Sequence, residues 1–133
     1  MSSCLFWSGL AGLTAVILGA FGAHALKAAL VERGMLEVWQ TAVLYHLVHA
    51  VAALAAGLAI VHGNGRELTP LIRRLRAACH CWLAGIFLFS GSLYLMAGLG
   101  VQHLGWVTPL GGVLFLAGWA FVLAAGWKKS DSL

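Results

Sequence analysis

Charged residues are scarce in this 133-residue chain, and acidic residues are the scarcest of them. Only 9% of the residues are charged and 62% are hydrophobic, and the four acids are Glu32, Glu37, Glu67 and Asp131. Soluble domains carry about 25% charged residues, so this composition and a mean hydropathy of +0.94 exclude an ordinary soluble protein. The chain is predicted to cross a membrane several times.

The long apolar runs contain no acidic residue, and this absence argues against several activities. Intramembrane proteolysis and proton pumping need paired carboxylates within the membrane. The sequence also has no glycine-rich phosphate loop with its lysine, no HExxH zinc motif and no nucleophile elbow. We therefore expect a protein that is not an enzyme and that carries no cofactor.

Cysteine is also rare, with three residues in the chain: Cys4, Cys79 and Cys81. Residues two apart on a helix point about 200° away from each other, so Cys79 and Cys81 cannot bind one ion without unwinding the helix. All three thiols fall at the side of the membrane predicted to be reducing. We expect free cysteines and no disulfide framework.

Four apolar runs are each long enough to span a bilayer, which needs roughly 20 residues. The spans are predicted at about 4–26, 39–62, 77–99 and 109–127 of a single transmembrane domain, 1–133. Residues 27–37 mix four charges with apolar side chains and suit a short interfacial amphipathic helix broken near Gly34. Trp39 is expected at the membrane boundary, and Thr108 as the N-cap of the fourth span. The predicted fold class is all-α, a bundle of four transmembrane helices with one interfacial helix between the first two.

Basic residues are distributed unequally between the two sides of the membrane. The side that holds both termini has six, namely Arg66, Arg73, Arg74, Arg76, Lys128 and Lys129, and the other side has Lys27 and Arg33. Because basic residues are retained in the cytoplasm, both termini are predicted to be cytoplasmic in a cell (inner) membrane. In a mitochondrial inner membrane, the alternative, they would face the matrix. We expect the lipid bilayer as partner and no nucleic acid, and we leave open a homo-oligomer or a larger membrane complex.

Small and bulky residues fall on opposite faces of the second span when it is drawn as a helix. The bulky face should meet lipid, and the small face should pack on other helices; the bulky set is Val43, Leu44, Leu47, Val48, Val51, Leu54 and Leu58. Close helix contacts are expected at Gly12, Gly19, Gly22, Ala53, Gly57, Gly91, Gly111 and Gly112.

Polar side chains of the spans are predicted to form one cluster in the outer half of the membrane, because unpaired polar groups in hydrocarbon cost several kcal/mol. The candidates are His24, Tyr45, His46, His49, Ser90, Ser92, Tyr94 and Thr108. One interpretation is interhelical hydrogen bonding in a structural or accessory protein. The alternative is a binding or transport site for a lipid, quinone, ion or proton. A metal or haem site on His24, His46 and His49 is disfavoured, since no carboxylate could orient the imidazoles.

Several short motifs, in the same order along nearly the whole chain, resemble one known family. They are Gly19-Ala20-Phe21-Gly22-Ala23-His24, Trp39, Tyr45-x-x-x-His49, Phe89-Ser90-Gly91-Ser92-Leu93-Tyr94, Thr108-Pro109-x-Gly111-Gly112 and Gly118-Trp119. The chain is similar to the family of unknown function typified by bacterial YgdD, with small eukaryotic transmembrane relatives. This resemblance implies a four-span membrane protein and leaves its activity open.

Overall fold

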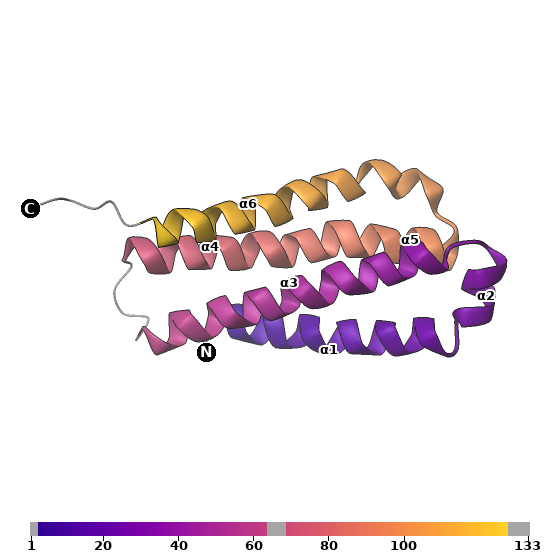
Figure 1. Ribbon diagram of the computed structural model, residues 1–133, viewed down its shortest axis with the longest axis horizontal. Helices are drawn as coiled ribbons and strands as arrows, with labels where there is room; N and C mark the ends of the chain where they lie inside the picture. The colour runs from indigo at the N-terminus through magenta and orange to yellow at the C-terminus, as the bar shows by residue number, and fades with distance from the viewer. Residues whose placement is uncertain (1–2, 64–68, 128–133) are drawn as a thin grey trace, which may run out of the picture.

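Four long apolar helices lie side by side in the computed structural model, which describes residues 3–63 and 69–127 (Figure 1). The elements are α1 (Ser3–Ala23), α2 (Lys27–Glu32), α3 (Leu36–His62), α4 (Pro70–Gly85), η1 (Ile86–Ser90), α5 (Gly91–Leu99), η2 (Gln102–Trp106) and α6 (Thr108–Gly126). Helices α4, η1 and α5 run on as one span, which we call the third span. The predicted all-α class and four apolar spans are confirmed.

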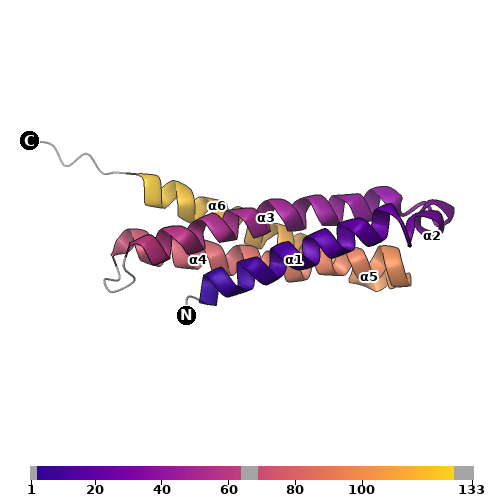
Figure 2. The ribbon, with the colours of Figure 1, turned by 90° about the horizontal axis from the view of Figure 1, so that it is seen from below.

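The connection that contains α2 lies at the opposite end of the bundle from the start of α1 and the end of α6 (Figure 2). Gly34 ends the α2 segment with a φ of +66°, a conformation that favours glycine. Its N–H donates to the carbonyl of Val31, and the next N–H, of Met35, donates to Leu30. This pair of bonds satisfies the last carbonyls of the helix, so the break expected near Gly34 is confirmed.

The third span begins earlier than predicted. Thr69 accepts a hydrogen bond from the Ile72 N–H at 3.3 Å, and Pro70 occupies the first turn of α4, as suits an N-cap followed by proline. Arg73 and Arg74 therefore lie on the helix and not in a loop. Arg74 donates to the carbonyl of Ala124 near the end of α6, where a cation is favourable for the helix dipole.

The fourth span does not use Thr108 as its cap, so that prediction is wrong. Thr108 is the first residue of α6, Val107 precedes it with helical backbone angles, and the Thr108 hydroxyl pairs with Ser92 instead. The 3₁₀ helix η2 leads almost directly into α6. A side-chain cap has no room here because the chain is already helical before Thr108.

Helices α1 and α3 form the first hairpin, with small residues along the seam. Gly22 lies against the ring of Trp39 near one end, and Gly57 against the backbone of Leu5 near the other. The residues of α1 that are buried recur at spacings of three, four and seven, as in a coiled coil: Cys4, Ser8, Ala11, Ala15 and Gly22. Their small side chains let the two backbones approach closely.

The third span and α6 form the second hairpin. Trp82 lies against Gly118, Phe115 against Gly85, and Phe89 against Gly111. The two helices are antiparallel, so an advance of three or four residues along the third span corresponds to an equal number of residues back along α6. The Ser92–Thr108 pair continues the same register. The π-helical turn η1 lies within this span, and the register with α6 continues across it.

The bulky face predicted for α3 points outward, apart from Val43. Leu44, Val51 and Leu58 are more than half exposed, as expected of a lipid-facing surface. Val43 is half-buried and packs on Gly19. Trp39 is 5% exposed, because Gly22 and Gly98 leave space for its ring inside the bundle. Its ring therefore packs on other helices and not on lipid, and its depth at the membrane boundary stays a prediction.

Candidate functional site: the polar groups at membrane depth

His46 joins both hairpins through its two ring nitrogens. It is 4% exposed and lies ten residues into α3, roughly 15 Å from the start of that helix. Its Nδ1 is 3.2 Å from the Tyr94 hydroxyl on α5, and its Nε2 is 3.4 Å from the Thr14 hydroxyl on α1. The predicted proximity of His46 and Tyr94 is therefore present, while Thr14 was not among the candidates.

The hydrogen bonds of Thr14 determine which nitrogen of His46 carries the proton. The Thr14 hydroxyl is 3.0 Å from the carbonyls of Leu10 and Ala11, which can only accept, so its single proton is directed to them. The Nε2–H of His46 must then donate to Thr14. A neutral imidazole has one N–H, so Nδ1 accepts from Tyr94.

His49, one turn further along α3, makes a separate set of contacts. Trp119 on α6 donates its indole N–H to His49 Nε2 at 3.2 Å, and His49 Nδ1 donates to its own helix at the Tyr45 carbonyl, 2.8 Å away. The imidazole also stacks on Phe115, with 3.6 Å between ring centroids and 9° between planes. Because indole nitrogen only donates, the proton of His49 lies on Nδ1, the opposite tautomer from His46.

Two serines of the third span have different surroundings. The Ser92 hydroxyl donates to the Phe89 carbonyl at 2.9 Å. Its oxygen also lies 2.7 Å from the Thr108 hydroxyl oxygen. Ser90 is fully buried, and its hydroxyl has no hydrogen-bond partner among the described residues; the same holds for the Trp82 indole nitrogen. Ser90 closes the π-helical turn η1.

The prediction of one continuous polar cluster is therefore wrong. The structure separates it into three sets, around His46, around His49 and at Ser92–Thr108. His24 lies exposed at the end of α1, away from the other imidazoles. Tyr45 is 40% exposed and packs its ring on Phe89, with centroids 4.6 Å apart. Positions three apart on a helix are separated by about 60° around its axis and roughly 4.5 Å along it, which is enough to direct His46 and His49 toward different neighbours.

The small residues predicted at helix contacts divide in a similar way. Close contacts are present at five of the predicted positions. A Cβ added at any of four glycines would press on a neighbouring helix: Gly19, Gly22, Gly57 and Gly111. The fifth position, Ala53, is fully buried. Gly12 has open space, and Gly91 and Gly112 meet neighbours only at about 4 Å. Gly85, Gly98 and Gly118, which were not predicted, also receive aromatic rings. Sequence spacing alone did not show which face of each helix these glycines occupy.

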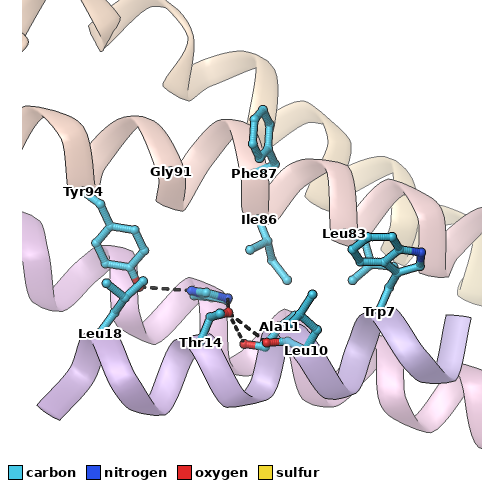
Figure 3. A pocket seen from close by; sticks show the side chains of 11 residues that line it. Trp7, Leu10, Ala11, Thr14, Leu18, Leu83, Ile86, Phe87, Gly91 and Tyr94 are labelled. Carbon is cyan, nitrogen blue, oxygen red and sulfur yellow. Dashed lines mark hydrogen bonds between the residues drawn. The ribbon is translucent and has the colours of Figure 1, made fainter.

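A cavity of about 340 Å³ lies beside His46, between α1 and the third span (Figure 3). Its apolar lining includes Leu10, Leu18, Leu83, Ile86 and Phe87. Thr14, His46 and Tyr94 supply polar groups at one end, and Trp7 supplies an indole N–H at the other. Phe87 is 78% exposed and Trp7 53% exposed at its rim. The cavity therefore opens on the lipid-facing surface of the bundle.

Metal-binding geometry is absent among the described residues: no three of their His, Cys, Asp and Glu side chains come together. His46 and His49 are directed to different helices, and both ring nitrogens of each already have partners. Cys4, Cys79 and Cys81 are free thiols.

Two residues that organise these sites, Thr14 and Trp119, were missed from the sequence. Thr14 is a polar residue of the first span, three residues after Ala11 and one before Ala15, both on the buried face. That position was the signal that could have identified it. Trp119 was noted as part of a motif and not as an N–H donor at membrane depth.

Comparisons with known proteins place these sites in a family context. The sequence pattern of a family described as "Protein of unknown function (DUF423)" matches residues 18–112. The UPF0382 membrane protein YwdK of Bacillus subtilis is 41% identical over 116 residues, which cover 87% of this chain and 89% of that protein. A UPF0382 membrane protein of Haemophilus influenzae is 41% identical over 93% of this chain and 92% of its own length.

A eukaryotic relative is similar over a comparable length. The UPF0382 membrane protein C1782.12c of Schizosaccharomyces pombe is 36% identical over 86% of this chain and 92% of that protein. No solved structure matches the chain.

Proposed function

Because the chain belongs to the DUF423 family, whose function is unknown, we propose that it is a non-catalytic structural or accessory component of the membrane. The observation that supports the proposal is the set of hydrogen bonds made by the two buried histidines, His46 and His49. Each has both ring nitrogens engaged by neighbouring groups of the bundle, and each links the first hairpin to the second. Polar groups in this arrangement stabilise helix association and have no free nitrogen for a metal or a substrate.

The test is the metal and haem content of the purified chain. An accessory protein should arrive without stoichiometric metal and without a Soret band, as measured by elemental analysis and absorption spectroscopy. His49→Gln should leave both measurements unchanged, as should the exposed control His24→Gln. Stoichiometric zinc, copper or haem that disappears in His49→Gln but persists in His24→Gln would assign the protein to a metal or redox class instead.

The membrane and the orientation are part of the same proposal. The chain is a membrane protein, and we infer that it lies in a cell inner membrane with both termini cytoplasmic, or in the mitochondrial inner membrane with both in the matrix. The support is the excess of basic residues in the 63–76 segment and the C-terminal tail. Lys27 and Arg33 are the exceptions. Arg33 has a structural partner, because it donates to the Gly98 carbonyl at 2.8 Å near the end of α5.

An accessory role also suggests companions in the membrane. We propose that the chain associates with further copies of itself or with a larger membrane complex, and the mass of the purified protein in detergent tests this association. We further infer that this family is the one typified by bacterial YgdD, on the motifs described above.

A further inference from the structure

The cavity beside His46 has the dimensions and lining of a small-molecule site. Its volume of about 340 Å³ lies at the lower end of the range of roughly 300 to 1,000 Å³ found for ligand pockets. Its length follows α1 from Trp7 to Leu18, which is roughly 16 Å at 1.5 Å per residue. Its open side faces lipid at Trp7 and Phe87 (Figure 3). A ligand would enter from the bilayer.

Charge narrows the class of ligand. None of the eleven residues that line the cavity carries a charge. A phosphate, carboxylate or ammonium group placed there would lose its hydration with no opposite charge to compensate, which is costly in an apolar environment. The ligand should therefore be uncharged.

The hydrogen bonds of the lining residues limit the class of ligand further. The protons of Thr14, His46 and Tyr94 are all donated within the bundle: Thr14 to the α1 carbonyls, His46 to Thr14, and Tyr94 to His46. The Tyr94 oxygen accepts no hydrogen bond among the described residues, and a phenol oxygen has lone pairs available. The polar end of the cavity thus offers an acceptor and no free donor. A quinone carbonyl, which needs a donor, could bind at this end only if one of these internal bonds were broken. The other N–H of the lining, the indole of Trp7, lies at the opposite end of the cavity (Figure 3).

We propose that this cavity binds an uncharged membrane-soluble alcohol, such as a long-chain or isoprenoid alcohol, whose hydroxyl donates to Tyr94 while its chain lies along α1. The site is independent of the accessory role proposed above, so it can fail while that role stands. One hydrogen bond of about 1.4 kcal/mol corresponds to a tenfold difference in affinity. We therefore expect the alcohol to bind about tenfold more tightly than a matched molecule whose hydroxyl is capped.

The test uses the full chain in phosphatidylcholine nanodiscs and a hexadecanol probe with a photoreactive diazirine in its chain. Labelling should saturate and map to the α1 and third-span residues of the cavity. Unlabelled hexadecanol should displace the probe at about one tenth of the concentration needed by its methyl ether or by a short-chain ubiquinone. Equal displacement by alcohol and ether, stronger displacement by the quinone, or labelling that does not saturate would each overturn the proposal.

Two variants and one control separate recognition from folding. Tyr94→Phe removes the acceptor oxygen, so the tenfold preference for alcohol over ether should disappear. Gly91→Leu places a side chain in the cavity, where a Cβ meets only the Ile86 carbonyl at 4.0 Å, and should abolish saturable labelling. Ser92→Ala, on the same helix but paired with Thr108 outside the cavity, should label like the wild type. Persistent saturable labelling in Gly91→Leu would contradict the site. If Tyr94→Phe does not fold, the wild-type comparison of alcohol with ether decides alone.

Discussion

The indole nitrogen of Trp119 lies 3.2 Å from Nε2 of His49 and joins α6 to α3 across the two hairpins. Since an indole only donates, this bond fixes the His49 tautomer and satisfies two polar groups that would otherwise face hydrocarbon. The same imidazole stacks on Phe115. His49 therefore stabilises the association of the hairpins by both polar and apolar contacts.

Replacement of His49 should distinguish these contributions. His49→Gln keeps an acceptor for Trp119 and should lose little stability. His49→Leu leaves the Trp119 N–H without its acceptor and should lower the free energy of unfolding by about 1 to 3 kcal/mol. Thermal unfolding in detergent measures both. Equal melting temperatures for the two variants would show that the hydrogen bond contributes nothing and that packing alone matters at this position.

Glycines that receive tryptophan rings should be sensitive to the addition of a single methyl group. A Cβ at Gly22 or Gly118 would overlap the indole of Trp39 or Trp82, so Gly22→Ala and Gly118→Ala should each destabilise the fold by about 1 to 3 kcal/mol through overpacking. Gly12→Ala is the matched control, since nothing lies within 4 Å of the added atom and alanine favours the helix. Loss of stability in Gly12→Ala comparable to that in Gly22→Ala would contradict this account.

The two serines of the third span provide a second matched pair. Ser92→Ala removes the bond to Thr108 and should cost about 0.6 to 1.7 kcal/mol, the range found for hydrogen bonds between membrane helices. Ser90→Ala removes a fully buried hydroxyl that has no partner among the described residues, so it should be neutral or stabilising. Chemical unfolding in mixed micelles checks both values. A larger loss in Ser90→Ala than in Ser92→Ala would show that the Ser90 hydroxyl has a partner.

The architecture could be predicted from the sequence because membrane solvation leaves few alternatives. Apolar runs of sufficient length must be helical, and Gly34 and Pro70 mark where helices end and begin. The bulky outward face of α3 followed from helical periodicity in the same way. Span limits were less certain: the third span was predicted to begin at about residue 77, yet Arg74 reaches the end of α6 from within α4.

The polar sites were harder to predict because they depend on how the helices are rotated against one another. The His46–Tyr94 pair was expected, but its third member, Thr14, comes from α1, and the partner of His49 is a tryptophan. Depth along the predicted spans was the basis for grouping the polar residues in one half of the membrane. Depth carried no information about which neighbouring helix each side chain faces, because that depends on how each helix is rotated about its own axis.

The orientation can be tested with single cysteines at opposite ends of the third span. In a background without Cys4, Cys79 and Cys81, Gln102→Cys places an exposed thiol in η2 and Arg73→Cys an exposed thiol near the start of α4. Basic residues concentrate at the Arg73 end, so that end should be cytoplasmic. A membrane-impermeant maleimide added to intact cells should then label position 102 and reach position 73 only after permeabilisation. The reverse pattern would show that the bundle has the opposite orientation, and that Arg33, held at Gly98, lies on the cytoplasmic side.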